Sequence, residues 1–377
     1  MVEEKRCPGC GAILQTLDDQ EQGYIPATLY NREDAICQRC FKLRHYGQFF
    51  TVPTVGKEYE KLLITANKEQ NLLVYVIDLF NFDGSIIGDL MDYVPHCPIF
   101  VVINKYDLLP KSLKEDKIKY WCSKKLNQLG IKYVDMVLIS TRNKKNTDGL
   151  FQRIYNHANH KNIYVIGNAN VGKSSLINIL LEQYDNETNQ YITSSIFPGT
   201  TISTIKIPLP GNIYLFDTPG MVSDSCLYRY LDHKNLKLVM NSREIKPLSI
   251  TLASGQSLFI GSLVCIDYLE GAPSIFLFYG SNGLKTFRVK TENSAEKFDT
   301  AQLNPDYVPK ANCYLSKASM DCYEFKLIDH ERISIMISGL GWFDLLKGSQ
   351  KIKVYVPKGI KVSLSEPMIG GNNLANK

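Results

Sequence analysis

The sequence predicts an α/β domain with a central, mostly parallel sheet, set between a small cysteine-rich module and a β-rich C-terminal domain. Four observations lead to this prediction. A glycine-rich loop joins an apolar strand to a helix within residues 163–180, and another apolar strand ends in an Asn-Lys-Tyr-Asp turn at residues 104–107. Two Cys-x-x-Cys pairs stand near the start, and short alternating runs fill the part after residue 248.

Composition sets broad limits on the function. The chain has 377 residues, 44% hydrophobic and 21% charged, with a formal charge of +5, which permits an RNA-binding surface without requiring one. No apolar run is long enough to span a membrane, and the start "MVEEKRCPGCG" lacks the apolar stretch of a secretory signal. We therefore expect a cytoplasmic protein with reduced cysteines and no membrane partner.

The N-terminal module, expected over residues 1–52, contains the two cysteine pairs. Cys7 pairs in sequence with Cys10, and Cys37 with Cys40. Four thiolates form a tetrahedral shell that suits a structural Zn²⁺, and metal binding would supply much of the folding energy of so small a module. A redox pair and an iron–sulfur cluster are the alternatives. The basic and aromatic residues that follow suit either stacking on nucleic acid or packing inside the module.

The central loop has the pattern of a phosphate-binding loop. "IYVIGNANVGKSSLINIL" matches G-x4-G-K-[ST] between a strand and a helix. Its main-chain N–H groups can surround a β-phosphate at the positive end of the helix. Lys173 is expected to bridge β- and γ-phosphate oxygens, and the Ser174 hydroxyl to bind Mg²⁺. The predicted nucleotide contacts are Gly167, Asn170, Val171, Gly172, Lys173, Ser174 and Ser175.

The Asn-Lys-Tyr-Asp turn predicts which base is bound. The Asp107 carboxylate can accept hydrogen bonds from the ring N–H and exocyclic amine of guanine, a donor pair that adenine lacks. The stem of Lys105 would lie along the base, and Asn104 would tie the turn to the phosphate-binding loop. A further strand tip at Ser140 and Thr141 is similar to the loop that contacts guanine O6, with Thr141 in place of the usual alanine. The predicted ligands are GTP and GDP.

Two later segments are similar to the switches of GTPases. In "IYLFDTPGM", Asp217 would reach the metal through water and the Gly220 N–H would meet the γ-phosphate. In "SSIFPGTTIS", Thr201 is preferred over Thr200 as the residue that completes the Mg²⁺ shell. Lys173, Thr201 and Gly220 are the expected catalytic groups.

The residue after the second switch predicts slow hydrolysis by the isolated protein. Met221 stands where many small GTPases carry a glutamine that orients the attacking water, and a thioether cannot do this. Asn170 matches in position the asparagine that binds K⁺ in cation-assisted GTPases. We hypothesise that K⁺ supplies part of the missing positive charge.

The order of the motifs identifies a family resemblance. The base-recognition turn precedes the phosphate-binding loop, as in a GTPase whose chain is circularly permuted, a change that is cheap where chain ends lie close together. Together with "CPGC", "CQRC", "DLFNFDGS" and "GSLVCIDYLEG", this order resembles the circularly permuted GTPases of ribosome assembly, and specifically their YqeH branch.

The resemblance implies a P-loop GTPase domain over residues 53–225 and a linker helix with a β-rich domain over 226–377. The alternation and the Gly, Pro and Asn punctuation after residue 248 favour the same mostly β domain, with a less regular part around 291–325. The resemblance also implies GTP hydrolysis and a role in biogenesis of the small (30S) ribosomal subunit, through contact with rRNA or the pre-ribosome. The alternative is a GTP-gated scaffold that binds RNA or protein and hydrolyses GTP incidentally. Seven basic residues either meet phosphates or form a solvated face: Lys285, Arg288, Lys290, Lys351, Lys353, Lys358 and Lys361.

Overall fold

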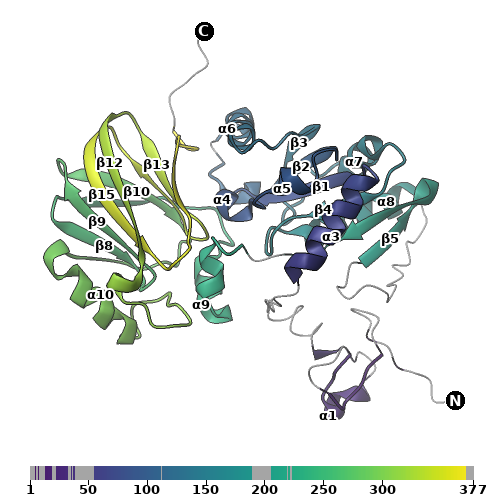
Figure 1. Cartoon of the computed structure of the whole chain (residues 1–377), viewed down its shortest axis with the longest axis horizontal. Coiled ribbons are helices and arrows are strands. Elements are labelled where there is room, and N and C mark those ends of the chain that lie inside the picture. The colour runs from purple at the N-terminus through teal and green to yellow at the C-terminus, as the bar shows by residue number, and fades with distance from the viewer. Residues whose placement is uncertain are drawn as a thin grey trace, which may run out of the picture.

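A computed structural model of the chain describes residues 5, 7, 13–18, 23–32, 35, 37–38, 55–111, 113–188, 205–218, 220 and 223–370. Figure 1 shows an α/β domain beside a β domain, with a small N-terminal region that contains α1 (Ala27–Tyr30). The predicted α/β domain and β-rich C-terminal domain are confirmed. Among the described helices, none is long and apolar enough to cross a membrane.

The α/β domain is built on a six-stranded sheet in the order β3-β2-β1-β4-β6-β5. Its strands are β1 (Leu72–Asp78), β2 (Ile99–Asn104), β3 (Asp135–Leu138), β4 (Ile163–Ile166), β5 (Ile205–Leu209) and β6 (Ile213–Asp217). Neighbouring strands are parallel, except that β5 runs antiparallel to β6, so the sheet is mixed. Strands β1, β2 and β4 are buried along their whole length, as expected of parallel strands covered on both faces.

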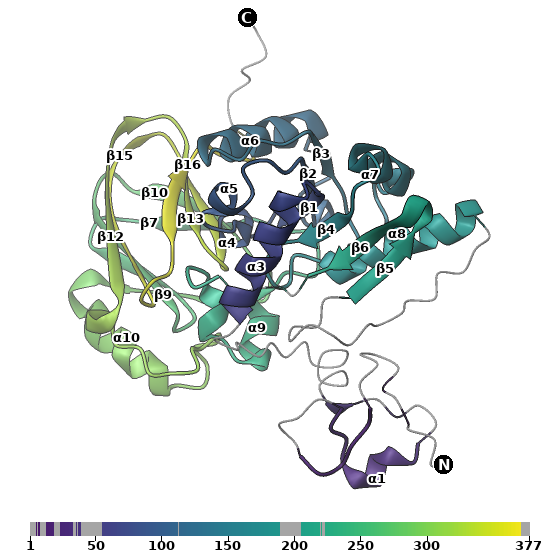
Figure 2. The ribbon, with the colours of Figure 1, turned by 45° about the vertical axis from the view of Figure 1, so that its right-hand side comes forward.

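Helices cover both faces of this sheet (Figure 2). They are α3 (Val55–Lys68), α4 (Phe82–Ser85), α5 (Leu90–Tyr93), α6 (Glu115–Gln128), α7 (Leu150–Ala158) and α8 (Lys173–Thr188). Apolar side chains of α3, α5 and α6 pack on one face with Leu73, Tyr75 and Ile77. Those of α7 and α8 pack on the other face with Val74 and Val76, because successive side chains of a strand point to opposite sides.

The C-terminal domain is a pair of antiparallel sheets that share one apolar core. One sheet contains β7 (Leu248–Leu252), β10 (Ser274–Gly280), β13 (Ile333–Ile337), β14 (Gly341–Leu345) and β16 (Val362–Ser365). The other contains β8 (Gln256–Ile260), β9 (Val264–Glu270), β11 (Thr286–Lys290), β12 (Asp321–His330) and β15 (Gly348–Val356). The region expected to be less regular contains helix α10 (Ser294–Leu303), and β12 begins inside it. The linker before the domain contains α9 (His233–Val239).

The two large domains share part of a core. The indole of Trp342 is buried, stacks on Tyr279 with ring centroids 5.0 Å apart, and lies 6.1 Å from the ring of Phe80 at the end of β1. The side-chain oxygen of Asn81 accepts a hydrogen bond from the Gly339 N–H at 2.7 Å. The short segment around α4 therefore forms part of the interface with the C-terminal domain.

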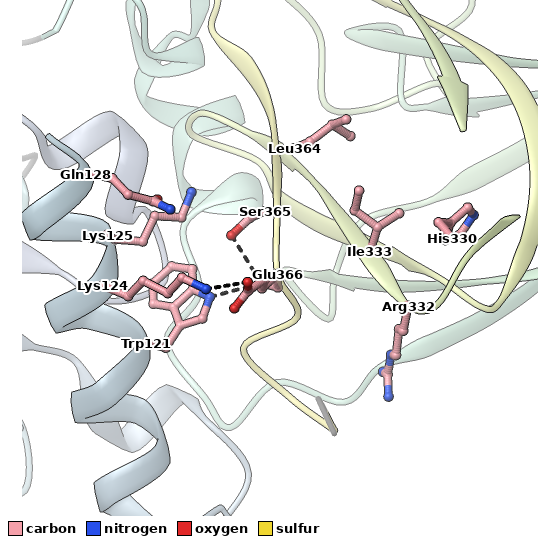
Figure 3. A pocket seen from close by; sticks show the side chains of 10 residues that line it. All are labelled: Trp121, Lys124, Lys125, Gln128, His330, Arg332, Ile333, Leu364, Ser365 and Glu366. Atoms are coloured by element: carbon pink, nitrogen blue, oxygen red, sulfur yellow. Dashed lines mark hydrogen bonds and ion pairs between the residues drawn. The ribbon is translucent and has the colours of Figure 1, made fainter. Parts of the chain in front are cut away.

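A pocket of about 310 Å³ marks a second part of this joint, where α6 faces β13 and β16 (Figure 3). Several of its polar groups have protein partners: Lys124 pairs with Glu366, the Trp121 indole donates to the Glu366 carbonyl at 2.9 Å, and Arg332 pairs with Asp344 at 2.7 Å. These contacts join the domains. Two buried lining atoms, His330 Nδ1 and Arg332 Nε, have no hydrogen-bond partner within the described part of the chain.

The basic positions along β15 are partly neutralised by neighbouring acids. Lys351 lies 3.4 Å from Glu270, and Lys353 lies 3.4 Å from Glu324 on the adjacent β12. Cross-strand pairs of this kind at the surface contribute little to stability but reduce the positive charge that phosphates would meet. For these two lysines the structure favours the solvated-face interpretation.

Candidate nucleotide-binding site

The phosphate-binding loop runs from the end of β4 to the start of α8. Gly167 and Gly172 have positive φ angles, and a Cβ on either would collide with its surroundings, at 2.5 Å from the Val76 carbonyl oxygen and 2.2 Å from Asn104 Nδ2 respectively. Both positions therefore require glycine. The Lys173 Nζ donates to the carbonyls of Gly167 at 2.8 Å and Asn168 at 3.0 Å, so the ammonium lies within the curve of the loop.

Asn104 joins this loop to the base-recognition turn. Its Nδ2 donates to the Val171 carbonyl at 2.8 Å and to Thr141 Oγ1 at 3.2 Å, and its Oδ1 accepts the Thr141 N–H at 3.0 Å. The side chain is fully buried, so each of these bonds forms away from water. The structure thus brings together three segments that the sequence separates by up to 67 residues.

The remaining residues of the turn are oriented by neighbours at the same sheet edge. Ser140 Oγ donates to Asp107 Oδ1 at 2.6 Å, which fixes one oxygen of the carboxylate. Lys105 has a left-handed backbone, with φ 67°, and its ammonium lies 2.6 Å from Asp78 Oδ2. Asp78 is a residue of this edge that no sequence motif marks. It could have been predicted only from its position at the end of the apolar strand β1, which places it beside Asn104 in parallel register.

The segment after β6 lies against the phosphate-binding loop. A Cβ built on Gly220 would come within 2.7 Å of Lys173 Nζ and 2.9 Å of Ala169 Cα. Burial raises the pKa of Asp217 to about 6, opposed by the Lys173 ammonium and by a hydrogen bond with Ser174. Burial likewise lowers the pKa of Lys173 to about 8, opposed by Asp217.

These groups fit a hard divalent cation. Among the described residues, Asp217 Oδ1 is buried without a hydrogen-bond partner, beside the hydroxyl of Ser174. Oxygen donors of this kind suit Mg²⁺, which keeps several waters and is held by few protein groups. Thr201 and Met221 lie outside the described residues, as do the first switch and the aromatic run after the second cysteine pair.

Half of the proposed zinc ligands can be placed. Cys7 and Cys37 are both buried, and the Cys37 N–H donates to Cys7 Sγ at 3.2 Å. Cys10 and Cys40 lie outside the described residues, and within the described part no group of three or more His, Cys, Asp or Glu side chains could hold a metal. A backbone N–H aimed at sulfur stabilises a thiolate. The four-cysteine zinc site stays a prediction, because only two of its ligands are described.

Comparisons with known proteins agree with this geometry. Residues 49–225 match the RsgA GTPase family, and residues 273–368 match the YqeH-like C-terminal domain. The chain is 34% identical over 371 residues to the uncharacterized protein YqeH of Bacillus subtilis (strain 168), covering 98% of this chain and 100% of that protein. It is 27% identical over 431 residues to a putative nitric oxide synthase of Oryza sativa subsp. japonica, covering 96% and 77%. It is 26% identical over 170 residues to the small ribosomal subunit biogenesis GTPase RsgA of Chlorobaculum parvum, covering 44% and 50%.

We predict that Lys173→Met raises the free energy of unfolding of the nucleotide-free protein by about 2 kcal/mol at pH 7, because it removes a desolvated ammonium. Folded Lys173 loses its proton near pH 8, whereas an unfolded lysine loses it near pH 10.5. Between these values the unfolded chain binds more protons, so wild-type stability rises with pH and the advantage of the variant shrinks.

Urea denaturation at pH 7 and pH 9.5, after removal of nucleotide, measures this difference. Lys161→Met is the matched control, since Lys161 is exposed and its loss should change stability by less than about 0.5 kcal/mol. A Lys173→Met protein less stable than wild type at pH 7 would contradict the prediction.

Proposed function

The chain belongs to the YqeH family of GTPases, which carry a circularly permuted RsgA-type GTPase domain, and from this premise we propose that it assists assembly of the small ribosomal subunit. The protein is a GTPase. The observation that carries the proposal is the site around Asn104, where a phosphate-binding loop and a guanine-type turn share hydrogen bonds. The name of the Chlorobaculum parvum relative supplies the candidate target.

Asp107 is the proposed guanine-specificity residue. Ser140 occupies one lone pair of its carboxylate at 2.6 Å, and a carboxylate has acceptor sites left for the ring N–H and amine of guanine. Lys105 and Thr141 would lie on either side of the same base. An adenine base would leave the half-buried carboxylate with unpaired acceptors, which lowers its affinity.

The phosphate end of the site is proposed to hold GTP with Mg²⁺. Lys173 would contact β- and γ-phosphate oxygens, and Ser174, Thr201 and, through water, Asp217 would hold the metal, which neutralises charge at the transferred phosphoryl group. Gly220 would donate its N–H to the γ-phosphate. The contact of Gly220 with the loop supports this placement.

The N-terminal region is proposed to be a zinc module that binds the small ribosomal subunit. The buried Cys7 and Cys37 support it, and a zinc content of one ion per chain is the measurement that decides it. The C-terminal β domain would provide a second binding surface for rRNA or ribosomal protein. The competing scaffold hypothesis uses the same surfaces but makes hydrolysis incidental.

We predict that Asp107→Asn weakens GDP binding by about 100-fold or more and creates binding of xanthosine diphosphate. The amide can donate to the C2 oxygen of xanthine, where guanine presents an amine. Competition with a fluorescent guanine nucleotide measures both affinities. Asp116→Asn, at an exposed position of α6, is the control and should leave both unchanged. An unaltered GDP affinity in the Asp107 variant would refute the assignment.

A second prediction concerns K⁺. If K⁺ at Asn170 supplies charge during hydrolysis, turnover in KCl should exceed turnover in matched NaCl by about tenfold, and Asn170→Ala should abolish the difference. The left-handed backbone of Asn170, with φ 66°, places it inside the turn of the loop. Equal rates in the two salts would remove the idea.

Co-sedimentation with 30S particles tests the function itself. A GTP-driven assembly factor should bind the particles with affinities that differ by about tenfold or more between GDP and a non-hydrolysable GTP analogue. The 50S particle is the control. Equal binding in both nucleotide states would favour the scaffold hypothesis, and no binding to 30S particles in either state would reject both.

A further inference from the structure

The segment from Asp78 to Ser85 contacts more of the molecule than its length suggests. Asp78, the last residue of β1, is 2% exposed and lies beside the base-recognition turn. Gly84, in α4, accepts a hydrogen bond from the side chain of Asn168 in the phosphate-binding loop at 2.9 Å. Asn81 binds the Gly339 N–H at 2.7 Å and lies 3.4 Å from Cys226 Sγ. One short segment therefore touches both ends of the nucleotide site and the C-terminal domain.

The Asp78 carboxylate is held in a fixed direction. Its Oδ1 accepts the N–H groups of Phe80 at 2.9 Å and Asn81 at 3.4 Å, and its Oδ2 lies 2.6 Å from Lys105 Nζ. The two side chains of this pair are 3% and 20% exposed, so the charges attract each other with little screening by solvent. The lysine is thus drawn toward the end of β1.

We propose that Asp78 is a positioning residue for guanine recognition, holding the Lys105 ammonium so that its aliphatic stem lies along the base. The inference rests on the proposed base site and adds a residue outside the Asn-Lys-x-Asp motif to it. Lysine has four flexible side-chain bonds and loses considerable entropy when ordered. A partner that orders it before the nucleotide arrives lowers the cost of binding.

A purely structural ion pair is the competing explanation. Buried ion pairs contribute little net stability, because desolvation of both charges offsets their attraction. The surroundings of Asp78 also brace it against movement: Ser85 Oγ contacts the Asp78 N–H at 3.2 Å and donates to the Asn81 carbonyl at 2.7 Å. Such rigidity around the carboxylate that pairs with Lys105 suits a positioning role.

A double-mutant cycle separates the two explanations. The four proteins are wild type, Asp78→Asn, Lys105→Met and the double variant, and GDP affinity is measured with a fluorescent analogue. Each single variant should weaken GDP binding about tenfold, and the double variant should be no weaker than Lys105→Met alone, because Asp78 acts through Lys105. At saturating GTP, turnover of Asp78→Asn should stay within about twofold of wild type.

Asp83→Asn is the matched control. Asp83 is also buried in this segment, but it accepts from Ser363 Oγ at 2.5 Å and lies 3.8 Å from Lys125, so its loss should leave GDP affinity within about twofold. Asp78→Glu keeps the charge and should recover part of the affinity lost in Asp78→Asn. It replaces Asp78→Asn in the cycle if that variant does not fold.

The outcomes are distinguishable. Additive effects of the two single variants, an unchanged affinity in Asp78→Asn, or no recovery in Asp78→Glu would overturn the proposal while leaving the base site intact. An unchanged GDP affinity in Lys105→Met would instead overturn the proposed base site, and the positioning role with it.

Discussion

The site depends above all on the amide side chain of Asn104. One fully buried group donates to the phosphate-binding loop and exchanges hydrogen bonds with Thr141, so three loops are held at fixed distances. The same amide closes off space: a side chain at Gly172 would overlap it. Hydrogen bonds depend on position in space and not on chain order. The bonds of Asn104 can therefore hold the three loops together equally well in a permuted chain. The site therefore depends on β1, β2 and β4 lying side by side in the sheet, and not on the order of the motifs along the chain.

The sequence allowed the fold class and most local elements to be predicted, because those features are encoded locally. Positive φ angles at Gly167 and Gly172 follow from a strand–loop–helix pattern, and buried strands follow from apolar runs. Strand β12 was missed although its pattern was present: the exposed Cys322, Glu324 and Lys326 alternate with the more buried Tyr323, Phe325 and Leu327. Helix α10 was missed for a different reason: only a few of its residues, such as Phe298, are buried, so its helical periodicity is weak.

Long-range side-chain pairs could not be predicted. Asp78 and Lys105 meet only because β1 and β2 are neighbours in parallel register, and Asn81 meets Gly339 across 258 residues. In the C-terminal domain, Lys317 is buried against Asp267 at 2.7 Å, and no spacing in the sequence indicates that pair. Such contacts depend on how sheets and domains are arranged, which composition and periodicity do not specify.

Each proposed nucleotide contact in the α/β domain that the structure describes lies at or beyond the carboxyl end of a strand, and none is proposed in the described loops at the amino ends. At the amino-end edge, for example, the Asn162 N–H donates to Asn71 Oδ1 at 3.1 Å, and the Leu72 N–H donates to the Asn162 carbonyl at 3.0 Å. A protein engineer could therefore open the chain there, or splice in a fluorescent reporter, and leave the chemistry of the opposite rim untouched. The same geometry gives evolution a safe place to move chain ends.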